Sequence, residues 1–214
     1  MEVGAAGKRK TQAARRREQL LEVAAALFSE RGFRQTSVRD VTRAAGVTEA
    51  VLYHYFANKV DLWIAVAAAY APFLRVRELL VPVAEAPPEA ALRHVGDELL
   101  RLLRLRPRLM LALLSEAPSE PEVAAALGGF LAGVRDDLGA FLAARQSRGG
   151  IAADIDPFAT AQAFQGALLI RFLTTSLALG SSDMDVVQDR EAVERLVAAL
   201  ALGFAPADDR RPAL

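Results

Sequence analysis

Apolar side chains recur along this 214-residue chain with the period of an α-helix, and glycine, proline and capping residues interrupt the repeats. The first repeat predicts a one-sided helix over about 15–31, which Gly32 ends. Residues 1–13 have no apolar periodicity and are expected to form a disordered basic arm. The apolar positions of the first stripe are Leu20, Leu21, Ala24, Leu27 and Phe28.

Three helix starts follow this stripe. Ser37 and Asn58 each precede an aspartate by three positions, a pattern typical of a capped first turn, and Thr48 is also a good N-cap. Gly46 can supply the positive φ that a tight turn between helices needs. The predicted elements are helices over 38–45 and 48–55, joined by a three-residue turn, and a longer helix from Lys59 that kinks or stops at Pro72.

The rest of the chain is a series of longer apolar repeats separated by proline and glycine. A proline-rich patch at 82–88 places the domain boundary between Pro72 and Pro88. We expect an N-terminal domain over 14–74, a second domain over 75–206 and a frayed tail over 207–214. The helices predicted in the second domain span 88–105, 107–116, 120–147, 157–179 and 189–204.

Composition narrows the fold class. Hydrophobic residues make up 53% of the chain, and alanine and leucine, both strong helix formers, account for most of them. Residues that favour strands are sparse. The expected fold is therefore all-α, with about nine helices in total. The most apolar stretch, 158–179, contains glutamine, arginine and three consecutive hydroxyl residues, which favours a buried or interface helix over a membrane span.

Several kinds of chemistry are disfavoured. The chain has no cysteine, so disulfides, thiolate metal sites and cysteine nucleophiles are excluded. The two histidines, His54 and His94, lie far apart, and no catalytic constellation or glycine-rich phosphate loop is visible. We expect a non-enzymatic protein without a metal or cofactor. Because no signal peptide is recognisable, we expect it in the cytoplasm and without a membrane partner.

Charge is distributed unevenly along the chain. Residues 1–59 contain 11 lysines and arginines against 6 acidic residues, a net charge of +5, whereas the remainder contains 15 against 20, a net charge of −5. This asymmetry favours a polyanionic partner for the N-terminal part. A solvated basic tail on an ordinary protein is the alternative.

The short helix, glycine turn and second helix form the arrangement that presents a helix to the major groove of DNA. In the second helix, Val51, Leu52 and Phe56 can pack back onto the preceding helices. The opposite side presents polar and aromatic groups able to hydrogen-bond with phosphates or base edges. These residues are Glu49, Tyr53 and His54, with Tyr55 at an edge.

The motifs in this region resemble the signature of the TetR family of bacterial repressors over about 60 residues. They include Ala26-Leu27-Phe28, Arg31-Gly32-Phe33, Thr36-Ser37-Val38, Gly46-Val47-Thr48, Leu52-Tyr53-His54-Tyr55-Phe56 and Asn58-Lys59-x-x-Leu62.

The resemblance implies a role in DNA binding for nine residues. Thr36, Ser37 and Thr48 would contact phosphate, and Thr48 would also cap the reading helix. Glu49, Ala50 and His54 would face base edges, whereas Tyr53, Tyr55 and Lys59 would contact the DNA backbone. Two residues depart from the pattern: Tyr55 stands where the family often has histidine, and Glu49 is useful beside DNA only if it accepts from a cytosine amino group.

The C-terminal domain is expected to dimerise and to bind a ligand. A DNA-binding motif this small needs two half-sites for useful specificity. A homodimer on a palindromic operator is therefore expected on physical grounds. The resemblance implies that the last two helices pair with their copies; a role in the monomer core is the alternative. The apolar positions concerned are Phe158, Phe164, Leu168, Phe172, Leu196 and Leu200.

Apolar residues of the middle helices could line a cavity for a small apolar or amphipathic effector, although each could equally be ordinary core. The candidates are Leu102, Leu103, Met110, Leu114 and Phe130. The basic run Arg101, Arg104, Arg106 and Arg108 could hold an anionic group of such a ligand, but a solvated face is the expected reading.

These features together predict a DNA-binding transcriptional regulator, with a ligand-responsive repressor as the leading hypothesis. Activation, or regulation without any ligand, stays open. The alternatives are a helical carrier or enzyme with an incidental basic N-terminus and a non-specific architectural DNA-binding protein.

Overall fold

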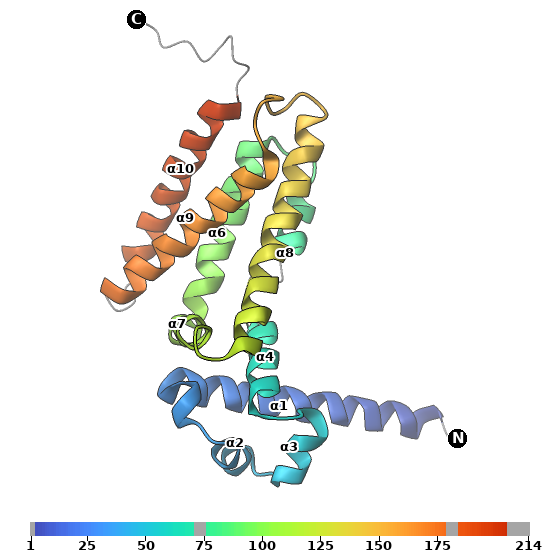
Figure 1. Ribbon diagram of the computed structural model, residues 1–214. Helices are drawn as coiled ribbons and strands as arrows, with labels where there is room; N and C mark the ends of the chain where they lie inside the picture. Colours follow the sequence, from blue (N-terminus) through green and yellow to red (C-terminus); the bar gives the residue numbers. More distant parts are fainter. Residues whose placement is uncertain (1–2, 71–75, 179–183, 205–214) are drawn as a thin grey trace, which may run out of the picture. The chain divides into compact units, whose positions relative to one another are not determined.

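A computed structural model describes residues 3–70, 76–178 and 184–204 of the chain and confirms the all-α fold (Figure 1). Over these ranges it has ten α-helices and one short 3-10 helix, against the nine or so expected. The helices are α1 (Val3–Gln35), α2 (Val38–Ala45), α3 (Glu49–Tyr55), α4 (Lys59–Tyr70), α5 (Val76–Leu80), η2 (Val81–Val83), α6 (Pro88–Leu105), α7 (Pro107–Glu116), α8 (Pro121–Gln146), α9 (Pro157–Ala178) and α10 (Met184–Phe204).

The helices divide into two compact units. Unit 1 comprises Met1–Ala71 and Arg108–Leu127, and unit 2 comprises Pro72–Pro107 and Gly128–Leu214. The units therefore differ from the two consecutive domains expected from the sequence, since the segment 108–127 groups with the N-terminal helices. The frayed tail expected over 207–214 lies outside the described residues.

Unit 1 is built around α1, against which α2 and α4 pack, while α3 packs on α2. Its centre is aromatic: the rings of Phe28 and Trp63 meet edge to face with centroids 4.6 Å apart, and Phe33 lies 5.3 Å from Trp63. Both Phe28 and Trp63 are fully buried. Within this unit, Arg34 at the end of α1 donates to the Glu116 carboxylate at the end of α7, at 3.3 Å.

The start of α1 differs from the expected disordered arm, because the helix already begins at Val3. Residues 3–19 are mostly alanine, arginine, lysine and glutamine, all good helix formers, which explains a helix without an apolar stripe. Gly32 interrupts the helix as expected, with a positive φ of 79°. Figure 1 shows the first turns of α1 running on past α2 and α3.

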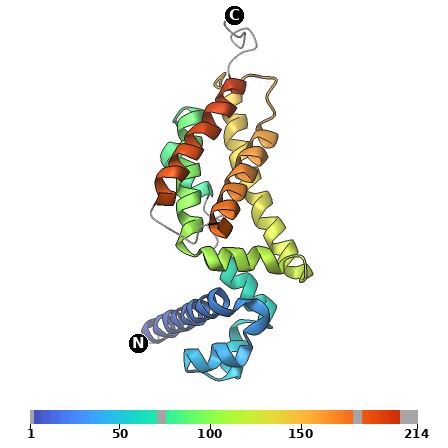
Figure 2. The ribbon, with the colours of Figure 1, turned by 90° about the vertical axis from the view of Figure 1, so that its left-hand side faces the viewer.

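Unit 2 is a bundle in which α6 packs against α9 and α10, as Figure 2 shows from the side. Close packing depends on Gly96 of α6, since a Cβ there would lie 2.9 Å from Cγ1 of Val193 and 3.1 Å from Cζ of Phe164. The sequence analysis did not predict α5 and η2. A helix as short as α5, placed between Pro72 and Pro82, cannot be distinguished from a loop by its sequence pattern. It also placed the start of α10 at 189 rather than 184.

The inward face of α9 corrects part of the dimerisation prediction. Phe164 and Phe172 are fully buried inside unit 2, and Leu168 is almost so. Their side chains therefore belong to the core of the protomer, and the prediction that they form a dimer interface is wrong. Phe158 is exposed, whereas Leu196 and Leu200 of α10 are half-buried.

None of the helices within the described ranges combines the length and the apolar character that crossing a membrane requires.

Candidate nucleic-acid interface

The first helix of the predicted reading motif, α2, begins with the expected capping box. The backbone N–H of Asp40 donates to the Ser37 hydroxyl at 3.1 Å, and the backbone N–H of Ser37 donates to the Asp40 carboxylate at 2.9 Å. The Ser37 hydroxyl also donates to the Asp40 carboxylate, and this bond, together with the one from the Ser37 backbone N–H, holds the pKa of Asp40 below its usual value. The box fixes the direction in which α2 leaves α1, because it satisfies backbone donors that no helical carbonyl can reach.

The turn after α2 depends on Gly46. This residue has the left-handed conformation, with φ 65° and ψ 36°, and its N–H donates to carbonyls of the last turn of α2. The N–H of Val47 donates to the Thr42 carbonyl at 3.0 Å. A side chain at position 46 would strain this conformation, so the glycine sets the angle between α2 and α3.

The second helix, α3, has the two faces that the sequence predicted. Leu52 and, just beyond the helix, Phe56 are fully buried, which fixes how α3 is rotated. The opposite face leaves Tyr53 48% exposed, and Ala50 and His54 are exposed as well. Tyr55 is half-buried, with its ring edge to face against His54 at 5.0 Å between centroids.

Thr36 does not lie where the resemblance implied. Its side chain is fully buried, and its hydroxyl donates to the Gly32 carbonyl at 2.8 Å. The kink at Gly32 turns this carbonyl out of the helical pattern, so Thr36 satisfies it and closes the connection to α2. The prediction that Thr36 contacts phosphate is therefore wrong for this structure, and its role is structural.

Thr48 confirms part of a second expectation. It occupies the N-cap position of α3, and its carbonyl accepts from Val51 at 3.1 Å, but its hydroxyl makes no capping hydrogen bond in the described structure. Since the residue is exposed, the hydroxyl is free to face a partner. The structure thus confirms Thr48 as the N-cap residue of α3, without the side-chain bond of a capping hydroxyl, and its phosphate contact stays a prediction.

Glu49 has a partner that the sequence reading missed. Arg39 of α2 forms an ion pair with it, with Nε 3.0 Å from Oε1. Arg43 lies one turn along α2 and approaches Asp40 to 3.8 Å. Arg39 and Arg43 are both largely exposed, and their i, i+4 spacing on the polar face of α2 was the signal that could have revealed them. Arg39 partly neutralises the acidic residue on the reading helix.

Lys59 is engaged within unit 1. Its ammonium group lies 4.1 Å from the centroid of the Phe33 ring, a cation–π distance. Burial lowers the pKa of Lys59, while the nearby carboxylates of Glu116 and Glu120 oppose the shift. Lys59 starts α4, as expected, and the N–H of Asp61 donates to the Asn58 side chain at 2.7 Å. The phosphate contact of Lys59 stays a prediction.

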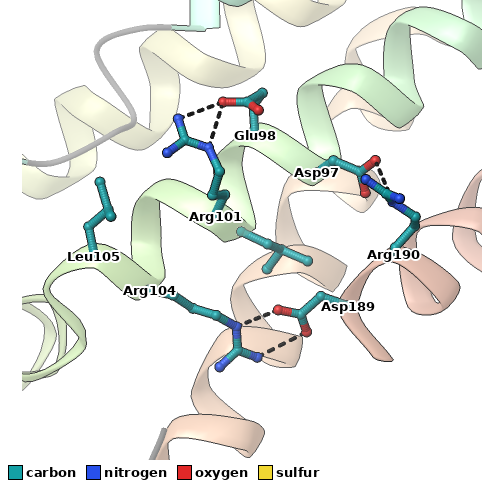
Figure 3. Close-up of a pocket in the computed structure, with 8 residues that line it drawn as sticks. Asp97, Glu98, Arg101, Arg104, Leu105, Asp189 and Arg190 are labelled. Carbon is teal, nitrogen blue, oxygen red and sulfur yellow. Dashed lines mark hydrogen bonds and ion pairs between the residues drawn. The ribbon is translucent and has the colours of Figure 1, made fainter. Parts of the chain in front are cut away.

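A hollow of about 300 Å³ lies in unit 2 between α6 and α10 (Figure 3). Three carboxylates and three arginines line it, and they are paired: Glu98 with Arg101, Asp97 with Arg190, and Asp189 with Arg104. Burial raises the pKa of Asp97. The lining therefore carries no excess charge that would select an anionic or a cationic ligand.

Arg104 is the most buried of these three arginines, and its contacts change the interpretation of the basic run that begins at Arg101. It bonds to the Asp189 carboxylate through Nε and Nη2 and to the Thr175 hydroxyl at 2.9 Å. Arg171 also donates to Asp189, at 2.9 Å. The prediction of a solvated face is wrong for Arg104, because Asp189 lies 85 positions away in the sequence but next to it in the fold.

The candidate effector-lining residues do not gather in one described hollow. Met110 and Leu114 fall in unit 1, whereas Leu102, Leu103 and Phe130 fall in unit 2. Leu103 and Met110 are buried, and the other three are half-buried. A second hollow, between α8 and α9, is lined by other residues. No group of three or more potential metal ligands occurs among the residues that the structure describes.

Removing the Ser37 hydroxyl provides a test of the capping box. We expect Ser37→Ala to lower the stability of unit 1 more above about pH 4 than in strong acid, where only the pH-independent capping bond to the Asp40 N–H is lost. The Asp40 carboxylate has a lowered pKa, so the stability it contributes is present above its unfolded pKa and is lost as the pH falls through the folded value. Urea denaturation followed by tryptophan fluorescence at several pH values measures this, because Trp63 lies in the core of the unit. A loss that is the same at every pH would contradict it.

Comparison with known proteins gives two family matches. The model for bacterial regulatory proteins of the tetR family matches residues 20–66, and the model for the tetracyclin repressor-like C-terminal domain matches residues 85–200. The HTH-type transcriptional repressor KstR2 of Mycobacterium tuberculosis is 53% identical over 47 residues, which are 22% of this chain and 24% of that protein. The HTH-type transcriptional regulator AcrR of Shigella flexneri is 41% identical over 58 residues, 27% of each chain. The chain thus spans about a quarter of the length of these curated relatives.

Solved structures extend the likeness of fold over most of the chain. The transcriptional regulator FadR of Bacillus subtilis, in complex with stearoyl-CoA, has a TM-score of 0.74 at 22% identity and covers 85% of this chain and 97% of that chain. The fatty acid degradation regulator FadR of Bacillus halodurans also has a TM-score of 0.74, at 21% identity, with 86% and 96% covered.

Proposed function

The chain belongs to the TetR family of bacterial regulatory proteins, and we propose that it is a sequence-specific DNA-binding transcriptional regulator that reads a palindromic operator as a homodimer. The observation that carries the proposal is the exposed face of α3. Leu52 and Phe56 hold the helix from behind, while Tyr53 and His54 project from the opposite side. Such a helix, held at a fixed angle by a capped turn, fits the major groove.

The roles of individual residues follow from their exposure. His54 and Ala50 face base edges, and Tyr53, Ser37 and Thr48 supply hydroxyl groups for phosphates. Glu49 also faces the groove. Its ion pair with Arg39 offsets the negative charge that would otherwise repel the DNA. Tyr55 and Lys59 are half-buried, so their contacts with the DNA backbone are peripheral.

Selection of bound duplexes from a random pool by the full-length chain tests the proposal. An inverted repeat with half-sites about one helical turn apart is the expected product. Weak, salt-sensitive binding without sequence preference would favour an architectural protein instead. No binding at physiological salt would favour a carrier or an enzyme.

Two substitutions on α3 should have different consequences. Tyr53→Phe removes only a hydroxyl and should weaken binding to all duplexes by a similar factor of up to about tenfold. His54→Ala should change which operator is preferred, with a shift of about 1–3 kcal/mol in discrimination at one base pair. Fluorescence anisotropy on a set of single-base operator variants measures both. His94→Ala, which removes the other histidine, is the matched control and should change neither; an equal loss on every operator for His54→Ala would make it a backbone contact.

The homodimer is proposed to form through the outward face of α9. Ala163, Gly166, Ile170 and Leu177 on this helix are exposed, although the helix is apolar on its inward side as well. An apolar face on both sides of one helix is expected when a second copy covers the outer one. Phe158, Leu196 and Leu200 remain proposed contributors, whereas the buried Phe164, Leu168 and Phe172 do not.

We further propose that a small apolar or amphipathic effector regulates DNA binding as an inducer of a repressor. Support comes from the relatives named as repressors and from the stearoyl-CoA complex of the B. subtilis regulator. A role for Leu102, Leu103, Met110, Leu114 and Phe130 in effector binding stays a prediction. A regulator of this kind would act in the cytoplasm, where the chromosome lies. Titration of acyl-CoA thioesters into the protein–operator complex tests the scheme, which requires release of the DNA.

A further inference from the structure

The described side chains of α1 that precede Leu20 lie outside the core of unit 1. Leu20 is the first buried residue among those whose burial is described, and residues 11–19 are all exposed except the half-buried Arg16. An isolated helix of this length is only marginally stable in water unless something else lies against it. We call residues 3–19 the α1 extension.

The α1 extension carries the excess positive charge of unit 1. It contains six basic residues and one acidic residue, a net charge of +5, whereas residues 20–71 contain five of each. The segment 108–127, which completes unit 1, adds one basic and three acidic residues. The helix-turn-helix itself therefore offers no net attraction to a polyanion.

The arginines of the helix-turn-helix region are also engaged by carboxylates, whereas the described arginines of the extension are not. Arg34, Arg39 and Arg43 each lie within 4.0 Å of an acidic side chain. Within the described part of the chain, Arg15, Arg16 and Arg17 pair with no carboxylate; Arg16 donates to the Gln19 amide at 2.9 Å. The charge available for phosphates thus lies in the α1 extension.

The base of the α1 extension is attached to the reading motif. The Arg17 guanidinium lies 5.3 Å from the ring centroid of Phe56, the residue that follows α3. The side chain of Gln19 donates to the carbonyl of Ala45, the last residue of α2, at 3.1 Å. The two basic triplets, residues 8–10 and 15–17, are seven positions apart, almost two helical turns, so their backbones share one side of the helix.

From these observations, and resting on the proposed function, we infer that the α1 extension is a second DNA-binding element, which binds the phosphate backbone beside the half-site read by α3. It supplies sequence-independent affinity, because phosphates carry the charge but not the sequence. An anionic membrane is a poorer partner, since the extension has no apolar face to enter lipid: Val3 is its only large aliphatic residue.

The test measures how operator affinity of the full-length chain depends on salt. The variant replaces Lys8, Arg9, Lys10 and Arg15 with glutamine, which keeps helix propensity and leaves the contacts of Arg16 and Arg17 in place. Each lost phosphate contact lowers the magnitude of the slope of log K against log salt by about 0.9, so the loss of one or two contacts in each protomer of the dimer lowers it by about 2 to 4. Operator and scrambled duplex should lose affinity by the same factor.

Two controls distinguish the effect of the charge in the α1 extension from the effect of the total charge of the protein. Replacing Arg135, Arg148, Arg190 and Arg195 of unit 2 with glutamine removes the same charge and should leave the slope unchanged. Exchanging lysine for arginine, and arginine for lysine, at the four positions of the extension keeps the charge and should restore it.

An unchanged slope in the glutamine variant overturns the inference, as does an altered sequence preference, which would place the extension in base reading. Loss of binding to vesicles of anionic phospholipid without loss on DNA overturns it in favour of a membrane. If the wild-type chain prefers no sequence but the slope still falls, the proposed sequence-specific function fails while the phosphate-binding role of the extension stands.

Discussion

Ile170→Arg is expected to convert the homodimer into monomers and to weaken binding to the palindromic operator by about a hundredfold or more. Ile170 is 60% exposed and lies in the middle of the outward face of α9. In an interface with twofold symmetry the same patch of each protomer is used, so one substitution places two guanidiniums in the apolar contact. Their desolvation would be uncompensated.

The effect on DNA follows from the loss of linkage between two readers. A dimer that holds its first half-site presents the second reader at a high effective concentration, which raises affinity by about 10²–10⁴. A monomer loses this factor but still reads one half-site. Binding to a duplex with a single half-site should therefore be almost unchanged in Ile170→Arg, while binding to the full operator falls.

Sedimentation equilibrium and anisotropy titrations on the two duplexes measure these outcomes. Leu105→Arg is the matched control, because Leu105 is 64% exposed on α6 and acquires the same charge. It should stay dimeric and bind the operator as the wild type does. A dimeric Ile170→Arg protein with unchanged operator affinity would show that this face of α9 does not hold the copies together.

The reading motif was predictable because its signals are local. Ser37 with Asp40 and Asn58 with Asp61 fix helix starts through hydrogen bonds that span three or four residues. Gly46 ends α2 for a reason contained in its own backbone conformation. Consequently the predicted bounds of α2 agree with the structure, and those of α3 differ by one residue.

The misassigned residues depend on partners that are distant in sequence or on geometry that periodicity does not encode. The position of Thr36 just before the second helix suggested a hydroxyl that binds phosphate. In the structure this hydroxyl donates instead to the Gly32 carbonyl, which the kink at Gly32 brings close to it. Helix α9 is apolar on two sides, so its stripe could not show that Phe164 faces its own core and Ile170 faces outward. The assignment of 108–127 to unit 1 likewise depends on contacts made after folding.

Asp189 is a buried charged residue whose loss should strongly destabilise unit 2. Its side chain is 8% exposed and that of Arg104 is 13% exposed, while Arg171 donates to the same carboxylate. We expect Asp189→Ala to lower the free energy of unfolding by about 3–5 kcal/mol, because it leaves two largely buried guanidiniums without their shared anion. Urea denaturation at a fixed protomer concentration measures the change, since dimerisation links stability to concentration.

Two further variants separate the buried charge from the helix on which it lies. Glu191→Ala removes an exposed carboxylate of α10 that pairs with Arg195 at 3.6 Å, and it should change the stability by no more than about 1 kcal/mol. The triple variant Arg104→Met, Asp189→Leu and Arg171→Met removes every charge of the cluster and should recover most of the loss, because apolar replacements fill the space without desolvation cost. A triple variant as unstable as Asp189→Ala would mean that the hydrogen bonds of the cluster, and not the unpaired charges, hold α6, α9 and α10 together.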